Sequence, residues 1–197
     1  MTFAPTPTSS ARAHAMSCDV TDTDAVHKTI ARIIAEFGGA PDVIVNNAGV
    51  FSLATIDATD ARDFRAALEV NLLAPFLLVR AFLPAMRERR SGHIVMIGSV
   101  ADRHIFPENG AYSASKFGAR ALHEVLRVEL RGSGVRTTLV SPGPVDTSLW
   151  EKINTDTREG FTPRSEMLRP DDVADAVRYV VSRPSDVNID ELRLSRT

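Results

Sequence analysis

The sequence predicts an α/β protein in which a parallel sheet of about five strands is flanked by helices. Short apolar runs that are typical of buried strands alternate along the chain with longer stretches whose apolar residues recur at a helical period. The 197 residues are enough for one domain with a hydrophobic core and are short for two. No internal repeat is visible.

The first predicted elements lie between residues 15 and 39. Residues 15–18 are a candidate strand, and residues 19–22 a turn that caps the next helix. Residues 24–37 carry apolar side chains at helical spacing, and Gly38-Gly39 ends this helix.

The later elements continue the alternation. A buried strand at 42–46 runs into the turn Asn47-Ala-Gly49. Gly132 ends one of the later helices, and Pro170 stands at the first position of the last one. The remaining predicted helices are residues 60–89, 112–131 and 171–182, and the remaining predicted strands are residues 93–98, 135–140 and 187–194.

Composition excludes several classes of protein. The formal charge of −2 gives no electrostatic reason to expect nucleic acid or a membrane as partner, and no apolar run approaches the roughly 20 residues of a membrane span. Cys18 is the single cysteine, and the five histidines lack ligand spacing, so we expect no disulfide and no metal site. Residues 1–14 lack the pattern of a signal peptide and are expected to be a flexible tail before a single domain, 15–197, in the cytoplasm.

Tyr112-Ser-Ala-Ser-Lys116 carries the clearest chemical signal, because it places a phenol and an ammonium four positions apart on one helix face. A lysine there stabilises the phenolate, so the tyrosine exchanges a proton nearer neutral pH than its ordinary pKa of about 10. Ser99, thirteen residues earlier at a strand end, could hold a substrate oxygen beside the phenol. The three side chains fit hydride transfer on a carbonyl or alcohol, with the hydride supplied by a cofactor.

These residues resemble the short-chain dehydrogenase/reductase (SDR) family, a branch of the Rossmann fold, and the resemblance runs from about Ala11 to the C-terminus. Each motif alone is weak, but six in the family's order and spacing form a strong signal. The motifs are Asp19-Val20, Asn46-Asn-Ala-Gly49, Asn71, Ser99, the Tyr112/Lys116 pair and Pro142-Gly-Pro-Val-Asp-Thr147.

The resemblance implies four catalytic residues. Tyr112 would be the general acid or base, and Lys116 would bind the nicotinamide ribose and lower the pKa of the tyrosine. Ser99 would orient the substrate oxygen, and Asn71 would hold a water that connects the lysine to solvent. The chain would then be an NAD(P)-dependent oxidoreductase that acts on a small carbonyl compound or secondary alcohol.

The resemblance also implies a set of contacts with NAD or NADP. Asp19 and Val20 would meet the adenine. Besides Tyr112 and Lys116, the ribose and nicotinamide would be met by Asn47, Ala48, Gly49, Pro142, Gly143, Val145 and Thr147. Family members commonly pair through the long helix and the Tyr/Lys helix, so a homo-oligomer, a dimer or tetramer, is expected.

Asn71 has an argument of its own. Pro75, four residues later, has no N–H, so the Asn71 carbonyl loses its helical partner. That carbonyl could accept a hydrogen bond from a bound water, and we expect the helix to kink there.

One part of the family pattern is missing from these 197 residues. No Gly-x-x-x-Gly-x-Gly occurs, and the first strand, 15–18, matches the third strand of the full fold. We therefore predict an N-terminally truncated Rossmann-type sheet. Residues 15–18 would slide beside the strand at 42–46 or stay loose, and one sheet face would keep exposed apolar surface.

Each candidate also has a simpler structural reading. The aromatic residues Phe106, Trp150 and Phe161, with His104, fall where substrate pockets form in the family, but we take them as packing residues. For the whole chain the alternative function is a catalytically silent SDR remnant or fragment that serves as a binding or oligomerisation module. The simpler readings are a strand end for Ser99, a tolerated polar residue for Asn71, a helix cap for Asp19, turn chemistry for 46–49 and an ordinary amphipathic helix for Tyr112 and Lys116.

Overall fold

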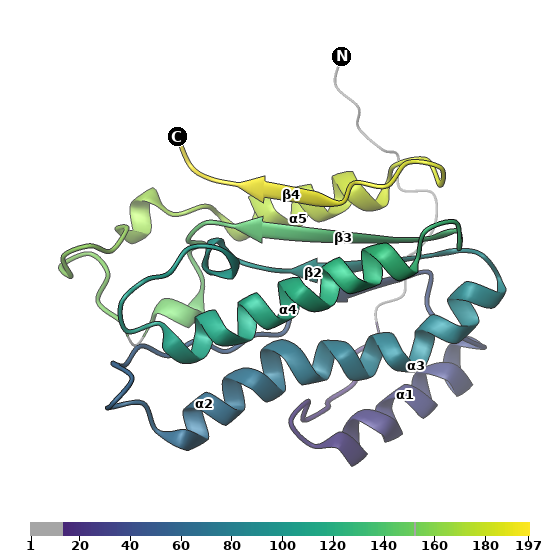
Figure 1. The fold of residues 1–197 in the computed structure, drawn as a ribbon, viewed down its shortest axis with the longest axis horizontal. Helices are drawn as coiled ribbons and strands as arrows, with labels where there is room; N and C mark the ends of the chain where they lie inside the picture. The colour runs from purple at the N-terminus through teal and green to yellow at the C-terminus, as the bar shows by residue number, and fades with distance from the viewer. Residues whose placement is uncertain (1–13, 152) are drawn as a thin grey trace.

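The computed structural model describes residues 14–151 and 153–197 as a sheet with helices on both faces (Figure 1). Within these residues all four strands are parallel and follow one another in the sheet in chain order. The predicted α/β fold is confirmed, whereas the predicted tail 1–14 lies, apart from His14, outside the described residues. The strands are β1 (Val43–Asn46), β2 (Gly92–Ile97), β3 (Val135–Pro142) and β4 (Glu191–Leu194).

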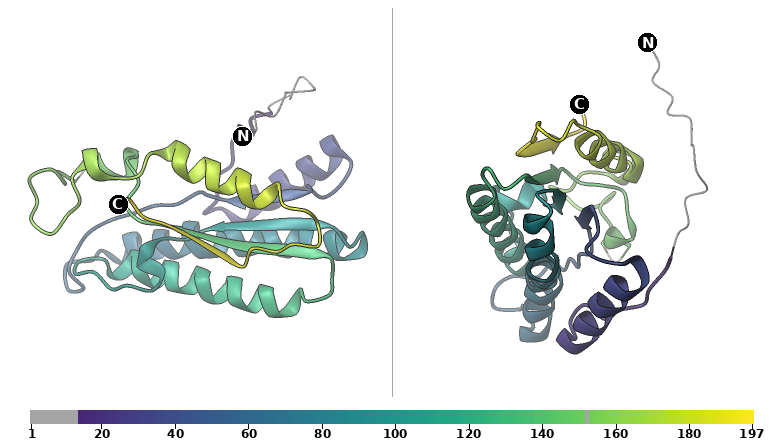
Figure 2. Two further views of the ribbon diagram at one scale, coloured as in Figure 1. Left: turned by 90° about the horizontal axis from the view of Figure 1, so that it is seen from above. Right: turned by 90° about the vertical axis from the view of Figure 1, so that its right-hand side faces the viewer.

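The helices form two layers around the sheet. Figures 1 and 2 show α3 and α4 on one face, α5 on the other, and α1 alongside α3. The predicted long helix, 60–89, is α2 and α3 joined by the π-helical turn Glu69–Leu73. The α-helices are α1 (Thr23–Phe37), α2 (Ala61–Leu68), α3 (Ala74–Glu88), α4 (Gly110–Glu129) and α5 (Pro170–Val181).

The helix ends follow the predicted signals. The Asp22 carboxylate caps α1 by accepting hydrogen bonds from the N–H groups of Asp24 and Ala25. Gly38 closes the same helix in the left-handed conformation, at φ 77°, which glycine adopts without steric cost. Pro170 begins α5, where its missing N–H removes no helical hydrogen bond.

The hydrophobic core divides on the two faces of β2, because successive side chains of a strand point to opposite sides. Ile94 and Met96 pack under α3 with Phe82 and Met86. Val95 points the other way into the cluster beneath α5. The stretch Ala61–Glu88 has the length and apolar composition of a membrane span, and 44% of its most apolar window is buried in this core.

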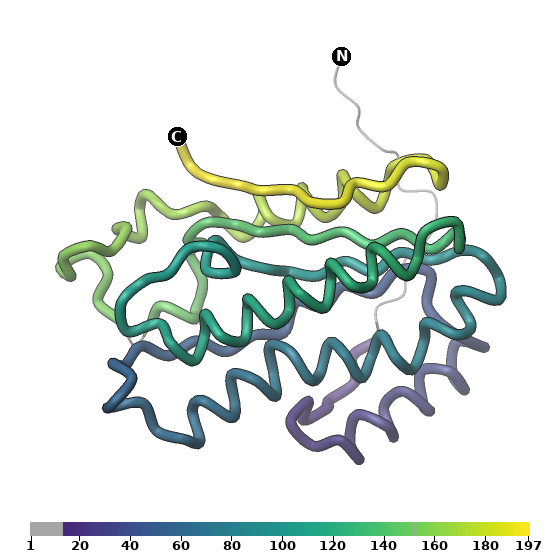
Figure 3. Tube along the Cα trace, in the orientation of Figure 1, coloured from purple at the N-terminus to yellow at the C-terminus, as the bar shows by residue number. Residues whose placement is uncertain are grey.

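Residues 15–18 form no fifth strand, so the prediction that they pair beside the strand at 42–46 is wrong, whereas the alternative, that they stay out of the sheet, is the one observed. The segment pairs with no strand among the described residues and approaches α1 as an irregular chain (Figure 3). Cys18 and Val20 pack against the cluster under α1 and α3, so side-chain burial takes the place of ladder hydrogen bonds.

The last strand is shorter than predicted, because a side chain takes over part of the pairing with β3. The Asn188 side chain accepts from the Thr137 N–H at 3.1 Å and donates to the Thr137 carbonyl at 3.1 Å. Backbone pairing between the strands then starts at Leu139 and Glu191. The predicted strand 187–194 is therefore reduced to β4.

One face of β1 has little cover from the described residues. Ile44 points into the core, but Val43 and Val45 are 39% and 43% exposed on the face that carries α5. The Ile34 and Phe37 side chains of α1 are exposed as well.

Burial of a histidine makes stability depend on pH. His93 on β2 is 1% exposed and bonds the Thr138 hydroxyl at 2.7 Å, and burial, with a smaller effect of Arg136, lowers its pKa from 6.5 to about 4. Above pH 6.5 the imidazole is neutral in the folded and unfolded chains alike. Between pH 6.5 and 4 the unfolded chain binds the proton first, so about 3 kcal/mol of stability should be lost.

Urea unfolding at pH 7.5 and 5.0 would measure this loss. His93→Gln, which can keep a hydrogen bond to Thr138, should show a smaller drop than the parent, whereas His27→Gln on the exposed side of α1 should match the parent. If the free energy of unfolding falls equally between pH 7.5 and 5.0 in His93→Gln and in the parent, a group other than His93 causes the loss of stability at low pH.

Candidate active site

A cavity of about 1060 Å³ opens at the carboxyl ends of β1, β2 and β3, between the start of α4 and α5. Ligands of open parallel sheets commonly bind at this edge. Asn71 lies next to the cavity, beside Gly49. Ten of the residues predicted for catalysis and cofactor binding line the cavity: Asn47, Ala48, Gly49, Ser99, Tyr112, Lys116, Pro142, Gly143, Val145 and Thr147.

Tyr112 and Lys116 project from the first turns of α4 toward the same end of β2. The Lys116 Nζ donates to the Ile97 carbonyl at 2.8 Å and lies 5.6 Å from the centre of the Tyr112 ring. Ser99 follows β2 after one residue, Gly98, and its hydroxyl lies close enough to the Tyr112 phenol to lower the pKa of the phenol by hydrogen bonding. The helix spacing and the strand end thus bring the three predicted groups together.

The protonation of the pair differs from the sequence-based prediction. Burial raises the pKa of the Tyr112 phenol above its usual value of 10, although the hydrogen bond with Ser99 opposes the rise. Burial also lowers the pKa of the Lys116 ammonium from 10.5 to about 8. In the chain without cofactor, loss of solvation outweighs any stabilisation of the phenolate by the lysine, so the phenol is neutral near pH 7.

Ser99 has a structural role as well as a place in the site. Its extended backbone, at φ −169°, makes it the N-cap of the short 3-10 helix Val100–Asp102. The Ser99 Oγ accepts from the Ala101 N–H at 3.1 Å, which fixes the side chain at the mouth of the strand. The alternative reading of Ser99 as a strand end is therefore compatible with its position beside the phenol.

Asn71 lies within the π-helical turn Glu69–Leu73 and is 3% exposed. In this turn the Ala74 N–H bonds the Glu69 carbonyl, and the missing N–H of Pro75 explains why α-helical pairing fails here. The predicted irregularity therefore takes the form of a π-turn, which adds one residue to the helix.

The Asn71 amide ties three elements together. It accepts from the Val50 N–H at 2.8 Å and donates to the Val50 carbonyl at 3.0 Å, which holds the loop after β1. It also donates to the Ser115 hydroxyl at 2.9 Å, and that hydroxyl donates to the Tyr112 carbonyl at 2.7 Å. Asn71 thus positions the turn that carries Tyr112, while its carbonyl as a water acceptor stays a prediction.

Two predicted cofactor contacts lie apart from this cavity. The Asp19 carboxylate is exposed and accepts from the N–H and hydroxyl of Thr21, at 2.9 and 2.7 Å, which shapes the turn before α1. Val20 packs on the hydrophobic cluster. Neither lines the cavity that holds the other predicted contacts.

Aromatic side chains that sequence reasoning passed over form one wall of the cavity. Phe51 packs edge-on against Tyr112 and against Trp150, with ring centres 4.9 Å apart in each pair. Phe161 continues the row at 6.5 Å from Trp150, whose indole N–H is fixed by the Val145 carbonyl at 2.9 Å. The sequence-based interpretation of Trp150 and Phe161 as packing residues misses this wall, and no sequence pattern marks Phe51, two positions after Gly49.

The rim of the same cavity is polar. Arg158 and Glu108 form an ion pair that joins the loop after β3 to the loop before α4. The Arg158 guanidinium also stacks 4.7 Å from the Phe161 ring centre. Among the described residues no group of three or more His, Cys, Asp or Glu side chains is placed to hold a metal ion.

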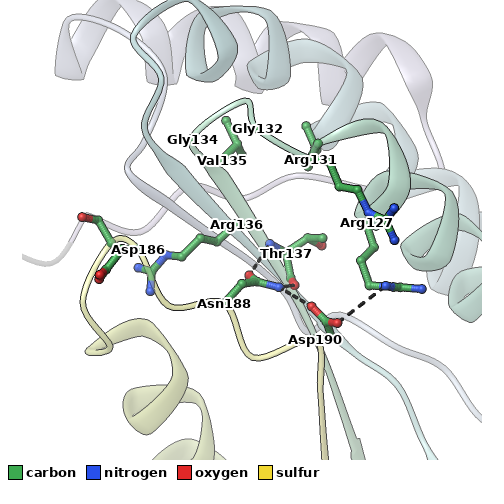
Figure 4. A pocket seen from close by; sticks show the side chains of 12 residues that line it. Arg127, Arg131, Gly132, Gly134, Val135, Arg136, Thr137, Asp186, Asn188 and Asp190 are labelled. Carbon is green, nitrogen blue, oxygen red and sulfur yellow. Dashed lines mark hydrogen bonds and ion pairs between the residues drawn. The ribbon is translucent and has the colours of Figure 1, made fainter.

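A second cavity, of about 350 Å³, lies at the opposite, amino end of β3 (Figure 4). Two of its arginine side chains, Arg127 and Arg136, have protein partners. Arg127 pairs with Glu124 and Asp190, at 3.0 and 3.6 Å. Arg136 donates to main-chain carbonyls between residues 181 and 187. These contacts fix the loop before β4.

Comparison with known proteins agrees with this geometry. A family model described as short chain dehydrogenase matches residues 4–158. An uncharacterized oxidoreductase of Staphylococcus saprophyticus is 33% identical over 177 residues, covering 88% of this chain and 72% of that protein. The sepiapterin reductase of Chlorobaculum tepidum is 32% identical, covering 92% and 72%. A solved metagenomic short-chain oxidoreductase in complex with NADP has a TM-score of 0.77 at 32% identity, covering 93% and 74%.

The role of Asn71 can be tested through stability. Asn71→Ala leaves the Val50 N–H and carbonyl without their partners and should lower the free energy of unfolding in urea by about 1 to 3 kcal/mol. Ser115→Ala removes one of the three hydrogen bonds of the Asn71 amide and should lower the free energy of unfolding by less than Asn71→Ala does. If Ser115→Ala costs as much as Asn71→Ala, the amide is not the main link between these elements.

Proposed function

This chain belongs to the short chain dehydrogenase family of oxidoreductases, and from that premise we propose that it moves a hydride between a nicotinamide dinucleotide and a carbonyl or secondary alcohol. The observation that carries the proposal is the meeting of three groups in one cavity, the Tyr112 phenol, the Ser99 hydroxyl and the Lys116 amine. A proton donor, an oxygen-binding hydroxyl and a cation are what reduction of a carbonyl requires from the protein.

Tyr112 would transfer the proton. Because burial raises its pKa, the phenol carries its proton near pH 7 and can give it to the oxygen of a carbonyl as negative charge develops there. Ser99, hydrogen-bonded to the phenol, would hold that oxygen within reach. The Lys116 ammonium, with a pKa of about 8, is mostly charged at pH 7 and would stabilise the phenolate that forms.

The cavity has the groups that a nicotinamide ribose needs. Within the described residues the Lys116 ammonium has one hydrogen bond, to Ile97, although an ammonium has three donors. Its remaining donors could bind ribose hydroxyls, and the loops Asn47–Gly49 and Pro142–Thr147 line the same space. When bound there, the nicotinamide would supply or accept the hydride.

The choice and the strength of cofactor binding belong to the proposal. The structural relative with a TM-score of 0.77 was solved with NADP, which favours NADP without deciding against NAD. The 197 residues contain no Gly-x-x-x-Gly-x-Gly, so we expect affinity to rest mainly on the nicotinamide end and to be weak. Each tenfold loss of affinity corresponds to about 1.4 kcal/mol.

The aromatic wall suggests which carbonyl compounds fit. Phe51, Trp150 and Phe161 lead from Tyr112 toward the rim, so the group attached to the carbonyl would lie against aromatic edges. Planar apolar groups gain from such contacts beyond their buried area. We therefore propose aryl or similarly apolar carbonyl compounds as substrates.

The alternative, a silent module that binds partners, is favoured by exposed apolar side chains on the helices. Phe117, Val125 and Val128 lie eight and three positions apart along α4, and they are 40%, 52% and 55% exposed. Phe76 on α3 is 41% exposed. These exposed apolar side chains support a homo-oligomer, a dimer or tetramer, under either function. The cytoplasmic location stays a prediction.

Titration with reduced nucleotides separates the two functions. If the chain is an oxidoreductase, NADPH or NADH should bind saturably, with a change in nucleotide fluorescence and a Kd of micromolar to millimolar order. Lys116→Met removes the ribose-binding cation and should weaken binding about tenfold or more, while Lys28→Met on the exposed side of α1 should not. No saturable binding of either nucleotide would favour the silent module.

Turnover tests the proton donor. Against a panel of aryl and alkyl ketones with each reduced nucleotide, Tyr112→Phe should lower kcat by roughly 1000-fold, because it removes the proton and leaves the ring packing. Tyr179→Phe, which changes the other tyrosine at a 51% exposed position on α5, should leave kcat unchanged. Equal rates for Tyr112→Phe and the parent would end the proposal.

A further inference from the structure

Asp102 is a charged residue with no exposed surface, and the mechanism above gives it no role. It ends the 3-10 helix that begins after Ser99. The Asp102 Oδ2 accepts from the Ser141 hydroxyl at 2.5 Å and from the Ser99 N–H at 3.4 Å. The other oxygen, Oδ1, accepts from the Arg103 Nε at 2.8 Å. A buried carboxylate of this kind costs folding energy unless its partners hold it in place.

The position of the carboxylate is set by Gly98, at the end of β2. A Cβ on Gly98 would stand 2.6 Å from the Asp102 Oδ2 and 2.7 Å from the Ser141 Oγ, so a glycine is needed for the carboxylate to lie there. The neighbours of Gly98 are Ile97, whose carbonyl binds Lys116, and Ser99, which binds the phenol. Asp102 therefore lies directly behind the backbone that carries both contacts.

We propose that Asp102 is a positioning residue that acts through its charge, holding Lys116 as an ammonium and fixing Ser99 at the mouth of β2. The proposal rests on the proposed function for its role in turnover, but the charge effect can be measured without cofactor or substrate.

The other charges around Asp102 lie nearer to solvent. Arg103 of its own segment and Arg120 of α4 approach Oδ1 at 2.8 and 3.5 Å, and both also pair with Glu191 of β4. The side chains of Arg103, Arg120 and Glu191 are 16%, 30% and 27% exposed, against 0% for Asp102. Solvent screens these three charges more than it screens the carboxylate, so the buried group acts more strongly on Tyr112 and Lys116.

The direction of this effect follows from the sign of the charge. The negative charge of Asp102 raises the pKa of Lys116, against the larger lowering by burial, and it also raises the pKa of Tyr112. Both effects keep protons where carbonyl reduction needs them, one on the phenol and one on the amine. Without that charge, burial would lower the pKa of the Lys116 ammonium further.

The chain offers a direct measurement, because it contains three lysines, Lys28, Lys116 and Lys152. In the full-length chain with Lys28→Arg and Lys152→Arg, Lys116 is the one remaining lysine. Lysine labelled with ¹³C at Cε would then give a single NMR signal whose shift follows the amine through its titration. The expected midpoint is about pH 8.

Asp102→Asn keeps the shape and the acceptor oxygen and removes the charge. The midpoint of Lys116 should fall by roughly half a pH unit or more. Ser141→Ala removes a hydrogen bond of the carboxylate and keeps the charge, so its midpoint should stay near that of the parent. A folded Asp102→Asn variant with the midpoint of the parent would show that Asp102 is merely structural and would overturn the proposal.

A second variant keeps the test decisive if Asp102→Asn does not fold. Arg120→Gln removes a partly exposed cation that compensates Asp102, so the Lys116 midpoint should rise. An unchanged or lower midpoint in folded Arg120→Gln would contradict the proposal. If the midpoints move as expected but no ketone is reduced, the charge effect stands and the proposed function fails, so the two failures are distinguishable.

Discussion

The site depends on keeping an ammonium charged inside the protein. Lys116 is 6% exposed, and burial alone favours its neutral form. Two features oppose this, the Ile97 carbonyl at the end of β2 and the buried carboxylate of Asp102 behind it. Both require the strand to end where it does, with glycine at 98 making room for the carboxylate. The position of the cation therefore follows from how β2, the 3-10 helix and α4 meet.

A second set of contacts fixes the site relative to the long helix formed by α2, the π-turn and α3. The π-turn places the Asn71 amide between Val50 and Ser115, so a local failure of helical pairing joins the loop after β1 to the start of α4. Polar side chains buried in this way are stable because each of their groups has a partner. The irregular turn thus sets the distance between the loop that lines the cavity and the helix that carries the phenol.

The helix ends and the irregular turn near Asn71 could be predicted from the sequence, because the residue patterns that specify them are local. Helical spacing, Gly38 after α1 and Pro170 at the start of α5 set the helix ends, and Pro75 marked the irregular turn near Asn71. The failures were cases in which one segment depends on a distant one. Residues 15–18 have the composition of a strand but no neighbouring strand to pair with, and Asn188 replaces part of a strand with its side chain.

The sequence by itself determined the parallel α/β class, the family motifs and the identity of the Ser99, Tyr112 and Lys116 group. The tertiary structure alone decided their electrostatics. Whether a phenol is made more or less acidic depends on its burial and on the charges that the fold places near it, such as Asp102. Spacing along a helix specifies which groups are neighbours, whereas burial is a property of the whole fold, and here burial outweighs the neighbouring cation.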